Sequence, residues 1–314
     1  MRTLLQRYRW WLLGGLAGLT LTAAIALAVS AGHRGGGTAP APQRSGAAVD
    51  SYRGLGSWVD LWDTRAWKDP AATIADMASH GVRTVYVQTG TARSASGVSN
   101  EPAMREFISE AHARQMYVVA WYLPNLKTGS VDFQRLVQAV EFRTNDGQGF
   151  DSVALDIEST AVKSISARNA NLATLSRKLR SRVGTDYPLG AIIPSPVGIT
   201  KQTGFWNVFP YSTVAKYYDV ILPMAYYTFH GHTGTQARTD ALTNMTLLRA
   251  QPGCAAVPVH LIGGVVGDSS SAEVREFTSA ARESGCIGAS LYDWAGTTKS
   301  QWKALTSAWT ATSQ

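Results

Sequence analysis

Two acidic residues near the middle of the chain, Asp156 and Glu158, have types and spacing suited to acid catalysis. They stand two residues apart at the end of the apolar, β-rich run 152–158 (SVALDIE). In a strand, residues i and i+2 point to the same face, about 6.6 Å apart. Two carboxyl groups that close repel each other when both are charged, so one of them is expected to keep its proton. Cleavage of a glycosidic bond needs such an acid, because the leaving oxygen must be protonated.

The elements that must position this pair follow a repeating pattern along the chain. After residue 53, short apolar runs alternate with helical patterns eight times. The expected strands are 56–61, 82–88, 116–122, 152–158, 188–193, 219–226, 257–263 and 287–293. The expected helices are 70–80, 101–114, 131–143, 161–183, 210–217, 235–250, 271–284 and 299–310. Strict alternation with continuous apolar strands predicts a parallel sheet covered by helices. Eight units predict its closure into a (β/α)8 TIM barrel, with an open doubly wound sheet as the competing fold.

A barrel would place the acidic pair where catalysis occurs. Active sites of TIM barrels lie at the carboxyl ends of the strands. Asp156 and Glu158 would project toward the barrel axis there, while Leu155 and Ile157 would point into the helix layer. No glycine-rich phosphate loop follows the first strand, which counts against a nucleotide-binding fold.

The strand-four segment resembles the signature of glycoside hydrolase family 18, the chitinase-like enzymes, whose pattern is D-x-x-D-x-D-x-E. Asp151, Asp156 and Glu158 match three of its four acids, and Ala154 stands in place of the second. Two weaker stretches agree. Residues 223–226 (PMAY) are similar to the family's M-x-Y at strand six, and residues 288–292 (GASLY) to its G-x-x-x-W at strand eight.

The resemblance implies substrate-assisted hydrolysis of a polysaccharide that contains N-acetylamino sugars. Glu158 would be the general acid, and Asp156 would orient the 2-acetamido group that attacks the anomeric carbon. Tyr226 would hydrogen-bond the carbonyl of that group. Tyr292, in the register of the family's tryptophan, or Trp294, on the same face if the strand continues, would lie beneath the sugar ring. The expected substrate-binding residues are Asp60, Asp151, Trp121, Tyr227, Tyr292, Asp293 and Trp294.

Two alternatives remain open at this stage. Asp60 ends the first strand, and a strand-one Asp combined with a D-x-E pair resembles the family 25 lysozymes. In that case Asp60, Asp156 and Glu158 would act on peptidoglycan. The chain also departs from the family 18 pattern at Ala154, and Tyr227 replaces the acid that usually follows the strand-six tyrosine. These departures leave a non-catalytic carbohydrate-binding barrel as the third hypothesis.

The N-terminal segment predicts export. Arg2, Arg7 and Arg9 precede an uncharged stretch from 10 to 32, which is long enough to cross the roughly 30 Å hydrocarbon core of a bilayer. We therefore expect a signal anchor or signal peptide over 1–31, a disordered Gly/Pro/Ala-rich linker over 32–52, and the barrel domain over 53–314. The barrel would lie outside the cell membrane on a single-pass anchor, or be secreted if the segment is cleaved.

Charge and cysteine content narrow the remaining classes. The net charge of +7 is concentrated in residues 1–53, which hold six arginines and one aspartate, so no basic surface for nucleic acid is expected. The partners expected are a polysaccharide or cell-wall glycan and the membrane. The two cysteines, Cys254 and Cys286, precede neighbouring strands and are expected to form a disulfide outside the cell. No H-x-H pair ends strand one, and His230 and His232 lie on a loop, so neither a metal nor another cofactor is expected.

Overall fold

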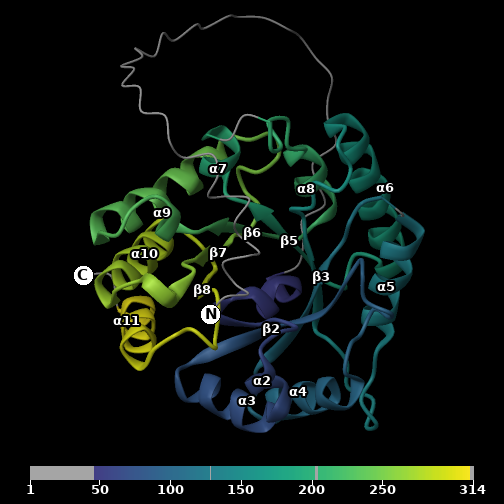
Figure 1. Cartoon of the computed structure of the whole chain (residues 1–314), viewed down its shortest axis with the longest axis horizontal. Helices are drawn as coiled ribbons and strands as arrows, with labels where there is room; N and C mark the ends of the chain where they lie inside the picture. Colours follow the sequence, from purple (N-terminus) through teal and green to yellow (C-terminus); the bar gives the residue numbers. More distant parts are fainter. Residues whose placement is uncertain (1–45, 128, 202–203, 312–314) are drawn as a thin grey trace, which may run out of the picture. The chain divides into compact units, whose positions relative to one another are not determined.

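The computed structural model describes residues 46–127, 129–201 and 204–311 (Figure 1). The expected anchor or signal segment and most of the expected linker therefore lie outside the described residues. Among the helices that are described, none combines the length and hydropathy needed to cross a bilayer. All described residues belong to one compact unit.

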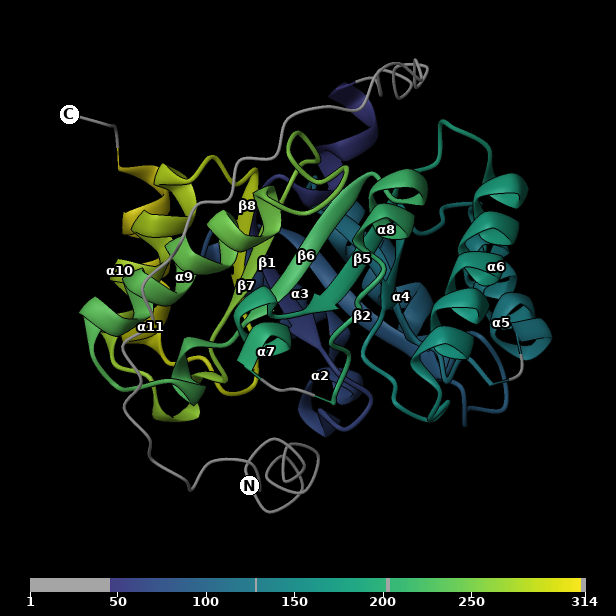
Figure 2. The ribbon, with the colours of Figure 1, turned by 90° about the horizontal axis from the view of Figure 1, so that it is seen from above.

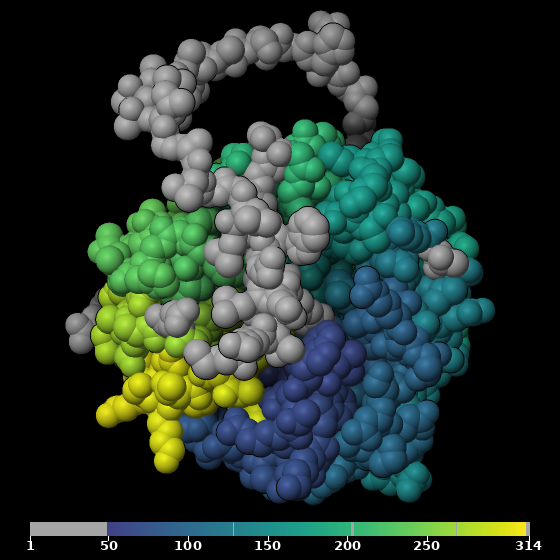
Figure 3. Space-filling view, in the orientation of Figure 1, coloured from purple at the N-terminus to yellow at the C-terminus, as the bar shows by residue number. Residues whose placement is uncertain are grey.

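Eight parallel strands close into a barrel in sequence order, with β1 paired to β8. They are β1 (Gly54–Val59), β2 (Val82–Thr91), β3 (Tyr117–Leu123), β4 (Ser152–Asp156), β5 (Leu189–Pro194), β6 (Val220–Ala225), β7 (His260–Gly263) and β8 (Gly288–Leu291). Each expected strand is found, and the predicted (β/α)8 barrel is confirmed. Figure 3 shows the consequence of closure at the surface, because the earliest and latest described segments, purple and yellow, lie next to each other.

Helices surround the strands, as Figures 1 and 2 show from two directions. The α-helices are α2 (Thr64–Lys68), α3 (Pro70–Ser79), α4 (Glu101–Ala113), α5 (Gly129–Glu141), α6 (Ile165–Val183), α7 (Pro196–Lys201), α8 (Tyr211–Tyr217), α9 (Gly234–Arg249), α10 (Ser271–Glu283) and α11 (Lys299–Thr310). Three 3-10 helices are also present: η1 (Gly46–Tyr52), η2 (Tyr227–Phe229) and η3 (Val266–Asp268). The short helices α2 and α7 were not expected from the sequence.

Side chains of each strand alternate between the barrel interior and the core beneath the helices. In β4, Val153 and Leu155 belong to the core between strands and helices, as does Ile157 just beyond the strand. Ala154 is also buried but, although apolar, is absent from that core, so it lies on the other side of the sheet, and Asp156, two residues on, shares its side. The backbone N–H of Ile157 donates to the carbonyl of Ile192 at 2.8 Å, so the hydrogen bonding between β4 and β5 continues one residue past Asp156. The predicted orientation of this strand is confirmed.

The amino-terminal end of the barrel is closed by Tyr52, the last residue of η1, so residues 46–52 are folded against the barrel and the expectation of a disordered linker is wrong for them. Its side chain is fully buried, and its carbonyl accepts a hydrogen bond from Nδ1 of His260 at 2.8 Å. Gly190 leaves room for the phenol, because a Cβ atom there would lie 2.5 Å from the Tyr52 hydroxyl oxygen. This end is therefore filled by packing, and the opposite end is left for chemistry.

The expected disulfide between Cys254 and Cys286 is absent, and both residues are buried free thiols. The two sulfur atoms have different neighbours. Sγ of Cys254 lies 3.9 Å from the carbonyl oxygen of Tyr211, whereas Sγ of Cys286 lies 3.5 Å from the sulfur of Met245. Two cysteines that precede neighbouring strands do not necessarily form a disulfide, because the bond also needs side chains that point at each other. Burial raises the pKa of each thiol to about 11, so both stay protonated.

Candidate functional site

A connected group of acidic and aromatic side chains lies at the carboxyl ends of β1, β3, β4, β6 and β8. Its centre is Asp156, the last residue of β4, whose side chain is only 3% exposed. Nε1 of Trp121, from β3, donates to Oδ2 of Asp156 at 3.0 Å. An indole N–H can donate but cannot accept, so this contact favours the carboxylate form of Asp156 as its partner.

Ala154 explains how the indole reaches Asp156. In the ladder between β3 and β4, Trp121 is the register partner of Ala154, and both are buried. The methyl group of Ala154 occupies little of the barrel interior, whereas a carboxylate there would compete with the indole for the same space. A large aromatic donor therefore stands beside the position where the family 18 pattern has an acid.

Tyr292 joins this acid to a second one. It follows β8, and its hydroxyl donates to Oδ2 of Asp60, which follows β1, at 2.9 Å. The other oxygen of Asp60 accepts the backbone N–H groups of Trp62 and Asp63 at 2.7 and 3.0 Å. The ring of Tyr292 meets the ring of Trp121 edge-on, with centroids 6.0 Å apart. Hydrogen bonds and ring contacts thus run continuously from Asp60 to Asp156.

Tyr226 completes the group from the β6 side. It follows Ala225 directly, and its ring centroid lies 6.3 Å from that of Tyr292. Phe229 packs edge-on against Tyr226 at 5.6 Å and is 39% exposed. Trp62, beyond Asp60, is 54% exposed. Two large exposed aromatic side chains therefore adjoin the group, one beside β1 and one beside β6.

Glu158 lies two residues beyond Asp156, on the turn that ends β4, and is half-buried. Ile157, between the two acids, packs in the core beneath the helices, so Asp156, the last residue of the strand, lies on the opposite side of the sheet. The sequence-predicted residues brought together are thus Asp60, Trp121, Asp156, Tyr226 and Tyr292, with Glu158 next to them in the chain.

Asp293 adjoins the group through its neighbour Tyr292. Its side chain is buried, and its Oδ1 accepts the backbone N–H of Gly296 at 2.9 Å. Burial raises the pKa of Asp293 to about 6, and the negative charges of Asp60 and Asp63 act in the same direction. Asp293 therefore keeps its proton to a higher pH than an exposed aspartate does.

Two predicted substrate-binding residues, Asp151 and Tyr227, lie elsewhere. Asp151 precedes β4, so it is at the amino-terminal end of the barrel, on the order of 16 Å from Asp156 along the strand. It accepts the N–H of Val118 at 2.7 Å and contacts Nε2 of His112 at 3.0 Å, which ties β3 and α4 together. Tyr227 points into the core beneath the helices, where its hydroxyl pairs with Ser269 at 2.7 Å.

Trp294 is also outside the group, because β8 ends at Leu291 and the alternation of faces does not continue. Its indole N–H donates to Oδ2 of Asp76, in α3, at 2.8 Å, and the guanidinium of Arg65 lies 4.1 Å from its ring centroid. Trp294 therefore packs among helices, and the expectation that it shares the face of Tyr292 is wrong.

Two residues of this end of the barrel were not singled out in the sequence. Trp58 in β1 stacks on Tyr86 with centroids 4.1 Å apart, meets Trp121 edge-on, and donates to Ser290 at 2.9 Å. Gln88 in β2 is fully buried, and its Oε1 accepts the N–H of Leu61 at 3.2 Å, which fixes the chain beyond β1. Gln88 could have been recognised in the sequence, because it is a polar residue at the end of the apolar run 82–88.

Metal ligands are not grouped in the part of the chain that is described: no three His, Cys, Asp or Glu side chains are placed to share an ion. His230, on the loop after β6, instead contacts Oδ2 of Asp240 at 2.9 Å through Nδ1. Asp240 belongs to α9, so this pair attaches the loop to a helix.

Comparison with known proteins identifies the fold. No protein-family model matches the chain, and no curated protein matches its sequence. Solved structures are similar, among them a chitinase from Chromobacterium violaceum (12% identity, 83% of this chain and 100% of that one, TM-score 0.60). The spore cortex-lytic enzyme SleL from Bacillus cereus gives 11% identity, 83% and 75% coverage and a TM-score of 0.61. An endo-β-1,4-mannanase from Thermotoga petrophila gives 9% identity, 84% and 77% coverage and a TM-score of 0.64. The fold implied by the chitinase-like signature is thereby confirmed.

Proposed function

We propose that this protein is a glycoside hydrolase that acts on a polysaccharide containing N-acetylamino sugars. One observation carries the proposal: Asp156 faces the interior at the carboxyl end of β4, hydrogen-bonded by Trp121 and connected through aromatic rings to Tyr226. The strand-four signature and the similarity to solved glycoside hydrolases support it.

In the proposed reaction, the carboxyl group of Glu158 donates its proton to the glycosidic oxygen, and the bond from that oxygen to the anomeric carbon breaks. The carbonyl oxygen of the substrate's own 2-acetamido group attacks the anomeric carbon and forms a cyclic oxazolinium ion. The carboxylate of Asp156 accepts the acetamido N–H, and Tyr226 donates to its carbonyl. Water then opens the ring and transfers a proton to the Glu158 carboxylate, which restores the acid.

Trp121 orients Asp156 in place of the acid that the family 18 pattern has at position 154, where this chain has Ala154. An acid at position 154 could exchange a proton with Asp156, whereas the indole N–H holds one oxygen of Asp156 as an acceptor. The other oxygen can then receive the acetamido N–H. This arrangement favours hydrolysis over the non-catalytic alternative, because Asp156 keeps a donor that orients it without the missing acid.

Asp60 favours the acetamido-assisted scheme over the lysozyme-like one. Three N–H or O–H donors already occupy its two oxygens, from Trp62, Asp63 and Tyr292. A carboxylate held in this way is suited to positioning the Tyr292 ring beneath a sugar. In the lysozyme-like scheme Asp60 would have to act on the substrate directly, with peptidoglycan as the substrate.

A substrate panel tests the proposal. Chitin oligomers, peptidoglycan and β-mannan are incubated with the full-length protein, and new reducing ends are measured. We expect product from chitin oligomers, inhibited by a thiazoline analogue of the oxazolinium ion. Release of muropeptides without inhibition by the thiazoline would point to the lysozyme-like scheme. Binding without release at high protein concentration would refute hydrolysis and leave a binding protein.

We also propose that the N-terminal segment exports the barrel, either as a membrane anchor or as a cleaved signal. Arg2, Arg7 and Arg9 ahead of an uncharged stretch support this orientation. Protease treatment of intact cells, followed by immunoblotting of the barrel, tests it. A barrel that resists protease until the cells are lysed would contradict export, and its mass distinguishes an anchor from a cleaved signal.

A further inference from the structure

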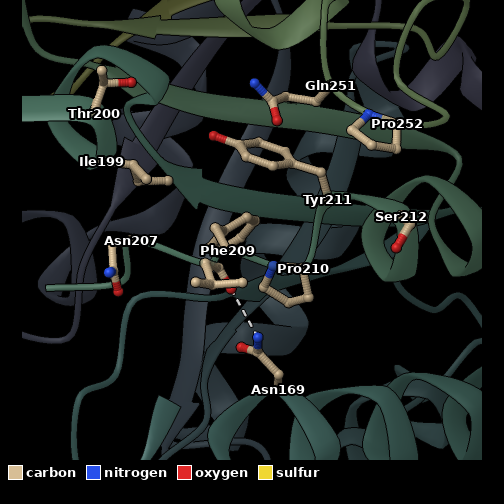
Figure 4. Close-up of a pocket in the computed structure, with 11 residues that line it drawn as sticks. Asn169, Ile199, Thr200, Asn207, Phe209, Pro210, Tyr211, Ser212, Gln251 and Pro252 are labelled. Carbon is tan, nitrogen blue, oxygen red and sulfur yellow. Dashed lines mark hydrogen bonds between the residues drawn. The ribbon is translucent and has the colours of Figure 1, made fainter. Parts of the chain in front are cut away.

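A cavity lies outside the barrel wall, on the side where β5 crosses to β6. That crossover uses two short helices, α7 with six residues and α8 with seven, whereas α6 beside it has nineteen. The thinner cover leaves a hollow of about 600 Å³ between α6, α7, α8 and the residues after α9 (Figure 4). This volume is within the range of small-molecule sites.

The lining of this cavity carries no ionic charge. Its side chains are amides, hydroxyls and apolar groups, represented by Asn207, Gln251, Ser212, Tyr211, Phe209 and Val208. The lining therefore presents only hydrogen-bonding and apolar groups to a ligand. A charged ligand would lose hydration here without gaining a partner of opposite charge, whereas an uncharged polar ligand needs no such partner.

Part of the wall is held rigidly. Nδ2 of Asn169 donates to the carbonyl of Val208 at 2.8 Å, and its Oδ1 accepts Nε1 of Trp206 at 2.7 Å. The rings of Phe209 and Tyr211 pack edge-on with centroids 4.9 Å apart. In Figure 4 the Tyr211 ring lies between Phe209 and Gln251. The aromatic surface is thus pre-formed, which lowers the entropy cost of binding.

Other polar groups of the lining remain available to a ligand. Counting only the described residues, the amide of Asn207 and the hydroxyls of Ser212 and Tyr211 make no hydrogen bond within the protein. Asn207 and Ser212 are exposed. Burial raises the pKa of the Tyr211 hydroxyl, which therefore remains a donor at neutral pH. Amides and hydroxyls both donate and accept, as sugar hydroxyls and acetamido groups do.

We propose that this cavity is a second carbohydrate-binding site, which holds an uncharged stretch of the same N-acetylamino-sugar polymer. This inference rests on the proposed function for the identity of the sugar. Phe209 and Tyr211 belong to the core beneath the helices, so the cavity is separated from Asp156 by the barrel wall. A site outside the wall retains a polymer near the protein between cleavage events, because binding at two places raises the effective concentration.

The first experiment measures binding without turnover. Glu158→Gln protein is titrated with the N-acetylglucosamine tetramer, and the side-chain amide signals of Asn207 and Gln251 are followed by NMR. We expect both signals to shift with saturation. In Asn207→Asp and in Tyr211→Phe, the shift of the remaining Gln251 amide signal should require at least fivefold more tetramer. Asn145→Asp, the same change at an exposed loop position outside the cavity, should leave it unaltered.

The second experiment separates this site from the reacting group. In otherwise unaltered protein, Asn207→Asp should lower retention on insoluble chitin and its hydrolysis severalfold, with no change on a short soluble chitobioside. Tetramer-induced shifts confined to residues around Asp156, or equal chitin retention by Asn207→Asp and Asn145→Asp, would overturn the inference. If no glycan is hydrolysed, the proposed activity fails, but saturable shifts of the Asn207 and Gln251 amides would still support the binding site.

Discussion

Trp121→Phe isolates the hydrogen bond that we hold responsible for orienting Asp156. The substitution keeps an aromatic ring in β3 but removes the N–H that lies 3.0 Å from Oδ2 of Asp156. Both side chains are almost completely buried, at 4% and 3% exposure. A hydrogen bond to a charged group is worth about 1.5–3 kcal/mol, which corresponds to roughly a 10- to 150-fold loss of kcat/KM if the bond is needed in the transition state.

The assay is hydrolysis of a soluble chitin oligomer. We expect kcat to fall with little change in KM, because the orientation of Asp156 matters most when the acetamido group attacks. A structural role alone would lower the free energy of unfolding without lowering kcat of the folded protein.

Trp58→Phe is the matched control for this prediction. Trp58 belongs to the same aromatic stack and is similarly buried, but its indole N–H donates to Ser290 at 2.9 Å, whereas that of Trp121 donates to Asp156. Both variants lose part of a buried ring, so both should be destabilised by a similar amount, on the order of 1–3 kcal/mol. Equal losses of kcat/KM in the two variants, or parental activity in Trp121→Phe, would refute the reasoning.

Three other predictions follow from individual residues. Burial lowers the pKa of His260 to about 4, so the stability that its neutral form contributes is lost as the pH falls from about 6.5 toward 4. The pKa of Asp293 is raised to about 6, so its protonated form adds stability as the pH falls below 6. The free energy of unfolding, measured with urea, should therefore fall by under about 1 kcal/mol between pH 6.5 and 5 for the parent and by about 2 kcal/mol for Asp293→Asn. The same pH dependence in both proteins would contradict the raised pKa of Asp293. Reduction by dithiothreitol should leave Tm unchanged, because Cys254 and Cys286 are free, and a drop of several degrees would mean that they are bonded. Trp62→Ala should raise KM for long chitin oligomers several-fold and spare the chitobioside, since Trp62 is exposed beside Asp60; equal KM values for both substrates would remove it from the binding surface.

The barrel and the orientation of β4 were predictable because they depend on periodicity. Apolar runs that alternate with helical patterns determine a covered parallel sheet, and the period of two in a strand determines that Asp156 faces away from Leu155. The same rule excludes Tyr227, which was nevertheless expected among the substrate-binding residues. Tyr227 follows Tyr226 directly and lies in the core beneath the helices, so only Tyr226 joins the group.

The parts of the site that were mispredicted depend on where strands end and on side-chain direction. Trp294 was assigned by continuing β8 past Leu291, where the chain turns. Asp151 matches a family signature, but its place before β4 puts it at the wrong end of the barrel. The disulfide was inferred from the proximity of two strands, which does not determine where the sulfur atoms point. The Trp121–Asp156 contact could not be predicted, because register between strands is a tertiary property.

Glu158→Gln gives the most direct test of the central claim, with Glu106→Gln, an exposed position on α4, as the matched control. The initial rate of reducing-end release from chitin oligomers is measured for both variants and the parent, and binding of the N-acetylglucosamine tetramer is measured in parallel. We predict a fall of about 10²- to 10⁴-fold for Glu158→Gln with tetramer binding retained, and parental rates for Glu106→Gln. Turnover by Glu158→Gln equal to that of the parent would show that Glu158 is not the general acid.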